Sequence, residues 1–223
     1  TLWHTLSLHD ALPISSADPD ALLWFGPKSK APEGETLHTA TWIYALVAPF
    51  PTLTDSISQN TLRVFWQGHH SETLKTVSKL YLPATISQEL AHRWGAAAEA
   101  NIEIYSSPPD IDSLWEENAW AILPFEDLHP RLKVIQIDGI SPLYHDFSPK
   151  NYPLALTYPL IQRSDLHNTF PSIDLNPLIR SIPATNRDTE KLTTLVMTGV
   201  TALVRATASR MEAKGVRYPG EKI

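Results

Sequence analysis

The sequence predicts an α/β fold in which a mixed sheet is flanked by helices. Residues 43–48 (IYALVA) form a near-continuous apolar run, which is typical of a strand covered on both faces. A helix signal that ends in a glycine follows this run, and later strand-like segments alternate with helix-like segments of about ten residues. Alternation of this kind requires crossover connections, so we expect a largely parallel or mixed sheet.

The segment 41–68 holds a strand, a loop and a capped helix. Pro49 and Pro51 end the predicted strand. Ser58 or Asn60 can accept hydrogen bonds from the first amides of a helix, and the glycine at the end of the segment stops that helix. The apolar residues on one face of the helix are Leu62, Phe65 and Trp66.

The remaining elements follow in the same alternation. Residues 22–25 form a short apolar cluster, and a polar connection that contains prolines comes after it. Downstream of the central segment we expect, in chain order, a strand at 74–82, a capped helix at 87–95, a strand at 101–105, a helix opened by Pro108, Pro109 and Asp110, and strands at 119–125 and 132–137.

Composition excludes several classes of function. The chain has 223 residues, 43% of them hydrophobic and 19% charged, which is ordinary for a globular protein. Its net charge of −6 lacks the basic surplus that neutralises nucleic-acid phosphates. Cysteine is absent, which removes thiolate catalysis and cysteine-bound zinc. No apolar run reaches the roughly 18 residues of a membrane helix.

The first residues need separate treatment. Residues 1–16 (TLWHTLSLHDALPISS) look like a translated sequencing-library adapter, so we expect them to be a non-native segment and exclude them from the fold. The chain begins without Met and ends abruptly at residues 221–223. Both features predict a fragment.

Two stretches within residues 40–161 resemble type II periplasmic solute-binding proteins of the phosphate-binding kind. In 41–68 a strand and a proline-containing loop lead to Leu-Thr and then to Leu, Phe, an aromatic residue and Gly. In 119–161 the order AWAILPFEDLHPRLKVIQIDG, gap, NYPLALTYPL is similar to that family's second lobe. The resemblance implies one lobe with part of the other, a small anionic ligand, and a location outside the cytoplasm, in the cell envelope.

Thr85 and Ser87 are the candidate ligand-binding residues. They lie at the start of the predicted helix 87–95, where free amides and the helix dipole favour an anion. The family resemblance implies ligand-contacting hydroxyls at a similar point. The alternative is that Ser87 is only the N-cap of the helix. No cofactor is expected.

Residues 185–219 resemble the junction at which poly-gamma-glutamate capsule biosynthesis (CapA) proteins of bacteria begin a metallophosphoesterase-like catalytic domain. Residues 192–197 match its first strand and residues 202–214 its first helix, which a glycine ends. The family places Gly-Asp after that strand, but here Gly199 precedes Val200, which cannot bind a metal. The resemblance implies a catalytic domain further downstream, while we expect this chain to be inert and to bind no metal.

Other polar residues have a structural interpretation beside a chemical one. His69 and His70 are possible metal ligands, but adjacent side chains diverge and no carboxylate lies at a useful spacing, which favours a solvated loop. Asp138, His145 and Asp146 are a second candidate cluster, for which a turn at the Asp-Gly pair is the simpler interpretation.

Two further groups are better explained without chemistry. Four acidic residues resemble acid/base pairs only by type, and a solvated helix face and a loop explain them: Glu116, Glu117, Glu126 and Asp127. The seven tryptophans suggest sugar stacking, but five of them lie in apolar periodic segments, which favours core packing. The five are Trp42, Trp66, Trp94, Trp115 and Trp120.

We therefore divide the chain into four segments: a non-native segment at 1–16, a first-lobe remnant and connection at 17–40, a solute-binding-like domain at 41–183, and a linker with a truncated CapA-type start at 184–223. The leading hypothesis is a non-catalytic solute-binding-like domain of a capsule-biosynthesis protein. The alternatives are a solute-binding receptor of an ABC-type transporter and a fragment of a metal-dependent phosphoesterase-like enzyme.

Overall fold

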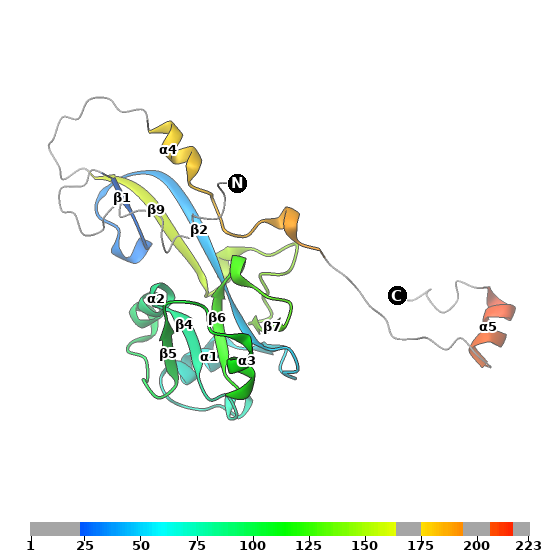
Figure 1. Cartoon of the computed structure of the whole chain (residues 1–223). Coiled ribbons are helices and arrows are strands. Elements are labelled where there is room, and N and C mark those ends of the chain that lie inside the picture. Colours follow the sequence, from blue (N-terminus) through cyan, green and yellow to red (C-terminus); the bar gives the residue numbers. More distant parts are fainter. Residues whose placement is uncertain (1–22, 164–174, 194–205, 216–223) are drawn as a thin grey trace. The chain divides into compact units, whose positions relative to one another are not determined.

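The computed structural model describes residues 23–163, 175–193 and 206–215. The chain divides into two compact units, residues 1–190 and residues 191–223. The first unit contains the sheets and most of the helices, and the second contains one described α-helix (Figure 1).

The elements of the first unit alternate as the sequence predicts. The strands are β1 (Leu23–Phe25), β2 (Gly34–Pro49), β3 (Ser56–Ile57), β4 (Leu80–Pro83), β5 (Ile102–Tyr105), β6 (Trp120–Pro124), β7 (Leu132–Val134), β8 (Gln136–Ile137) and β9 (Ala155–Arg163). The α-helices are α1 (Gln59–Trp66), α2 (Ala84–Trp94), α3 (Ile111–Glu116) and α4 (Asn176–Ser181). Among the short 3₁₀ turns, η1 (Lys28–Lys30) and η3 (Phe125–Asp127) border the candidate site.

The long strand β2 connects two differently built parts of the main sheet. Its first part, Gly34–Ile43, pairs antiparallel with β9, which also pairs with β1. Its second part pairs antiparallel with β6 and β7. Beyond β6 the sheet continues through β4 to β5 in parallel pairs, so the strand order is β1-β9-β2-β6-β4-β5 (Figure 1). The predicted mixed α/β sheet is confirmed.

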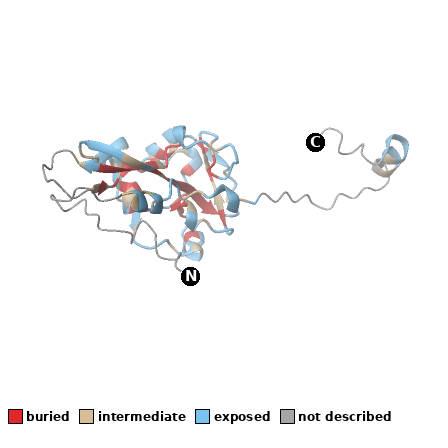
Figure 2. Cartoon of the chain, turned by 90° about the horizontal axis from the view of Figure 1, so that it is seen from above, coloured by how far each residue is buried: buried red, intermediate tan, exposed pale blue. Residues whose placement is uncertain are grey.

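Apolar side chains fill both faces of the sheet around β6. The larger cluster includes the α1 and α2 residues Phe65, Trp66, Ile86 and Leu90, each at most 1% exposed. The smaller cluster packs Leu114 of α3 over alanine-rich positions of β2 and β6. Figure 2 shows the buried residues concentrated along the strands. Small side chains on the second face allow a helix of only six residues to cover it.

Helix α1 forms as its sequence predicts. Ser58 is the N-cap and accepts a hydrogen bond from the Thr61 amide at 3.0 Å. The indole of Trp66 is fully buried and donates to the carbonyl of Gly95 at 2.9 Å, so its polar atom is satisfied. Gly68 follows the helix with φ at +92°, a conformation that favours glycine.

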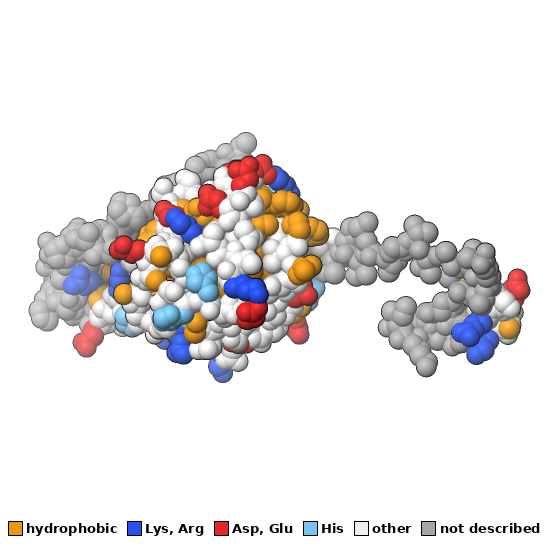
Figure 3. All heavy atoms as spheres, turned by 90° about the horizontal axis from the view of Figure 1, so that it is seen from below, with side chains coloured by type: hydrophobic (Ala, Val, Ile, Leu, Met, Phe, Trp, Pro, Cys, Tyr) orange, Lys and Arg blue, Asp and Glu red, His pale blue; other side chains and the backbone are white. Residues whose placement is uncertain are grey.

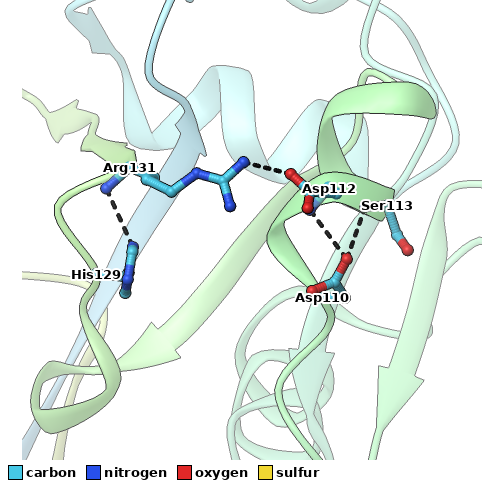
Figure 4. A network of polar contacts seen from close by, with 5 residues as sticks. All are labelled: Asp110, Asp112, Ser113, His129 and Arg131. Carbon is cyan, nitrogen blue, oxygen red and sulfur yellow. Dashed lines mark hydrogen bonds and ion pairs between the residues drawn. The ribbon is translucent and has the colours of Figure 1, made fainter.

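Helix α3 begins at the predicted proline-flanked aspartate. Asp110 accepts hydrogen bonds from the amides of Asp112 and Ser113 (Figure 4). Asp112 in turn pairs with Arg131, whose amide donates to His129 Nδ1. These polar contacts attach the start of α3 to the loop before β7, and they account for this cluster of charged side chains as structure.

Three expectations about elements are wrong. The strand expected at 74–82 exists only as β4, because the chain turns at Leu74–Val77 and the Ser78 amide donates to the Asn118 carbonyl. The expected connection covers only residues 26–33, because residues 34–40 already belong to the first part of β2. Trp115, expected in the core, is 43% exposed, because its neighbour Leu114 occupies the buried position of α3.

The second unit contains helix α5 (Ala206–Lys214). The amide of Gly215 donates to the Met211 carbonyl and the glycine has φ at +95°, so the predicted glycine stop is confirmed. Most of the predicted strand 192–197, Val200 and the adapter-like segment 1–16 lie outside the described residues. None of the described helices is long and apolar enough to cross a membrane.

Candidate functional site

The parallel strands β4, β5 and β6 end at one edge of the sheet. The residues that follow them there belong to α2, the loop after Tyr105, and η3. In open sheets of this kind, ligands bind outside the carboxyl ends of the strands, where loops and helix starts converge. Polar groups at this edge are therefore the candidates for ligand binding.

Helix α2 starts directly at this edge without a side-chain cap. Its N-cap is Pro83, which has no amide hydrogen and makes no capping hydrogen bond. The amides of Ala84, Thr85 and Ile86 precede the first bond within the helix, which the Ser87 amide can make to Pro83. Three donors and the positive end of the helix dipole are thus available at this point.

The structure separates the roles of the two predicted site residues. Thr85 lies in the first turn of α2 and is half-buried. Ser87 lies one position beyond the free amides and is 7% exposed. Because the N-cap is Pro83, the alternative interpretation of Ser87 as the N-cap is wrong. Ligand binding by Thr85 and Ser87 remains a prediction.

A cluster of phenol hydroxyls surrounds Thr85. The Tyr44 hydroxyl of β2 lies 3.3 Å from Thr85 Oγ1, and the Tyr158 hydroxyl of β9 interacts with that of Tyr44. Burial raises the pKa of Tyr44 above its usual value of 10.0 and raises those of Tyr105 and Tyr158 strongly. All three phenols keep their protons at neutral pH, and Tyr105 donates its own to the Ile122 carbonyl at 2.9 Å.

Carboxylates border the same cluster from η3. Glu126 accepts hydrogen bonds from Trp42 Nε1, at 3.1 Å, and from Asn186 Nδ2. Partial burial raises the pKa of Glu126, although these hydrogen bonds and one from its own backbone act in the opposite sense. The negative charges of Glu126 and Asp127 also contribute to the raised pKa of Tyr44, so they act on the Thr85 region.

Positive charge reaches α2 from the connection between β1 and β2. In η1, Lys30 Nζ donates to Gln88 Oε1 at 2.8 Å, and Ser29 donates to the buried carboxylate of Glu89. Gln88 is neutral, so this hydrogen bond is not an ion pair. On the face seen from below, basic and acidic side chains are interspersed and do not gather by sign (Figure 3).

Three of the remaining candidates have structural contacts. His70 packs edge-on against Phe65, with ring centroids 5.2 Å apart. Asp138 and Gly139 have positive φ values of 52° and 76°, and Asp138 accepts from the Gln59 amide, which confirms the Asp-Gly turn. Glu117 accepts from the Tyr81 hydroxyl at 2.7 Å. Within the described residues, no three His, Asp or Glu side chains form a group that could hold a metal ion.

Sequence reasoning did not identify the partners of Thr85. Tyr44 and Tyr158 lie inside apolar runs and are read as core residues, which their burial supports. Asn186 is 143 residues from Ile43, whose amide it binds, and no local pattern predicts such a contact. The pairing of the strands in the sheet, and no local sequence pattern, brings Tyr44, Tyr158 and Asn186 together.

The comparisons with known proteins give structural likeness at low sequence identity. No family model and no curated protein match the chain. The fold is similar to that of an ABC-type phosphate transport receptor from Vibrio cholerae, with a TM-score of 0.48, 16% identity, and 71% of each chain covered. It is also similar to a protein from Clostridium perfringens described as a phosphate ABC transporter substrate-binding protein with bound phosphate. There the TM-score is 0.46 and the identity 13%, over 66% of this chain and 68% of that one.

Proposed function

We propose that this chain is a solute-binding-like domain of a protein outside the cytoplasm, and that it binds a small oxyanion at the start of α2. The observation that carries the proposal is the uncapped first turn of α2 at the carboxyl edge of the parallel strands, with the Thr85 hydroxyl beside it. Free amides, hydroxyls and the helix dipole together favour an oxyanion. The sequence resemblance of residues 40–161 to phosphate-binding receptors supports this choice of ligand class.

The charges around the site limit the affinity. A bound oxyanion is attracted by the α2 dipole and by Lys30. It is repelled by the carboxylates of Glu89, Glu126 and Asp127, which outnumber the single lysine. We therefore expect weaker binding of a dianion than of a monoanion of the same size. A titration with inorganic phosphate at pH 6 and pH 8, on either side of its second ionisation near 7, measures this difference.

Isothermal titration calorimetry with inorganic phosphate tests the proposal itself. Thr85→Val removes one hydroxyl and keeps the side-chain volume, and a hydrogen bond to a charged group is worth about 1.5–3 kcal/mol. We expect the affinity to fall at least tenfold, while the matched variant Thr76→Val, at an exposed position outside the site, leaves it unchanged. Absence of saturable binding of phosphate and sulfate to the unchanged chain contradicts the proposal.

Glu126→Gln tests the local electrostatics. The substitution removes a negative charge and retains an oxygen that can accept from Trp42, whereas the Asn186 amide loses its acceptor. We expect phosphate affinity to rise a few-fold, with the largest gain at low ionic strength. Equal affinity in both proteins at low salt shows that the ligand lies elsewhere.

The finer assignments rest on sequence alone. The resemblance of residues 185–219 to CapA proteins suggests a capsule-biosynthesis parent with a catalytic domain downstream, and none of the comparisons supports it. The division at residues 183 and 184 is likewise a proposal, and the described residues 184–190 belong to the first compact unit. We therefore favour solute binding of the receptor kind over a role in capsule biosynthesis.

A further inference from the structure

Residues 184–187 lie against the edge of β2 at the point where the strand changes partners. Pairing with β9 ends at Ile43 and pairing with β6 begins at Tyr44. Backbone groups alternate sides along a strand, so the amides of Thr41 and Ile43 point to the edge that β6 covers only from Tyr44 onward. Without residues 184–187 these amides lack a strand partner.

The segment 184–187 supplies the missing partners. The Thr41 amide donates to the Ala184 carbonyl at 2.8 Å, and Thr41 and Thr185 form a parallel bridge. The Asn186 side chain then takes the place of a backbone unit. Its Oδ1 accepts from the Ile43 amide at 2.7 Å, and its Nδ2 donates to the Ile43 carbonyl at 2.9 Å.

The same segment also contacts residues outside β2, in η3 and in the loop 142–147. Asn186 Nδ2 donates to Glu126 in η3, directly after β6. Arg187 donates to the carbonyls of Pro142, at 2.7 Å, and Tyr144, at 2.5 Å. Its guanidinium lies 5.1 Å from the ring centroid of Phe147 and 5.9 Å from that of Phe125.

We propose that residues 184–187 act as a strap that fixes the β1-β9-β2 ribbon to the half of the unit built on β4, β5 and β6. The strap bonds to β2 on the ribbon side of the change of partners and to η3 and the loop 142–147 on the other side. With the strap in place the two halves move as one body. When it detaches, the ribbon stays joined to the other half through β2 and through the hydrogen bonds from η1 to α2. The change of partners in β2 is then the place at which the two halves can bend. The inference does not depend on which ligand the site binds.

Two measurements on the variants Asn186→Ala and Arg187→Ala test the strap. Hydrogen exchange at the Thr41 and Ile43 amides should become at least about tenfold faster, while exchange at Ile122 in β6 stays unchanged. The natural chain has no cysteine, so spin labels at Glu35→Cys in β2 and Glu116→Cys in α3 report one distance between the halves. We expect its distribution to broaden in both strap variants.

A matched control and a second variant keep the test decisive. Arg180→Ala, at an exposed position in α4, removes the same charged group outside the strap and should change neither measurement. If Asn186→Ala fails to fold, Arg187→Ala carries the test, because its contacts lie outside the sheet. An unchanged distance distribution, or faster exchange at Ile122 equal to that at Ile43, overturns the strap.

Discussion

The two halves of β2 belong to one strand but have opposite environments. In Gly34–Thr41 only Ala40 is buried, and four of the first eight residues are threonine or histidine. From Trp42 to Pro49 every residue is buried. The first half pairs with β9, whereas the second lies in the sheet between α1 and α2 on one face and α3 on the other.

This difference shows that a residue can belong to a strand without its side chain lying in the core. Hydrogen bonding to β9 extends β2 well beyond the core, because strand pairing in the β1-β9-β2 ribbon satisfies the backbone without burying the side chains of β2 residues 34–39. The buried half is held by packing from both faces. Substitutions should therefore have large effects in the second half and small effects in the first, except where backbones approach closely.

The largest effect is expected at Leu46, which is fully buried in the second half. Leu46→Ala removes three carbon atoms from a close-packed site and leaves a cavity, so the free energy of unfolding should fall by about 2–5 kcal/mol. Urea unfolding followed by circular dichroism measures the change. A loss under about 1 kcal/mol means that the second half is not a packed core.

An intermediate effect is expected at Gly34, the first residue of the exposed half. A Cβ placed there meets the Gln162 carbonyl oxygen of β9 at 2.2 Å, so Gly34→Ala must push the two backbones apart. We expect a loss of about 1–3 kcal/mol in the same unfolding experiment. Because Glu33 lies next to it and is exposed, Glu33→Ala is the matched control and should be neutral.

The smallest effect is expected at Thr39, an exposed residue in the middle of the first half. Thr39→Ala removes no buried surface, and we expect the unfolding free energy to change by less than about 0.5 kcal/mol. A loss as large as that of Leu46→Ala erases the contrast between the halves. Such a loss indicates that the Thr39 side chain is buried against another surface.

The difference in burial also explains why the sequence predicts the second half of β2 and not the first. Apolar runs and caps are local signals, and they identify residues 43–48, α1 and the start of α3 correctly. The exposed half alternates weakly and contains polar residues, so it is read as a connection until β9 is known to pair with it. The strand expected at 74–82 fails in the opposite direction, because its apolar residues pack in a turn.

The site is predictable only in part. Thr85 lies next to a helix start, which is a local signal, although the boundary lies three residues earlier than the sequence suggests. Its surroundings are formed by Tyr44, Tyr158 and Glu126, which come from β2, β9 and η3. Their convergence depends on the strand order, which a sequence without a known register does not determine.

Nuclear magnetic resonance of the backbone amides tests oxyanion binding most directly. Titration of the ¹⁵N-labelled chain with inorganic phosphate should produce saturable shifts of the Ala84, Thr85 and Ile86 amides, because these donors precede the first bond within α2. The amides of the capped helix α1, where Ser58 already serves as acceptor, should not shift. Saturable shifts elsewhere with these three amides unmoved, or no saturable shift at all, contradict oxyanion binding at α2.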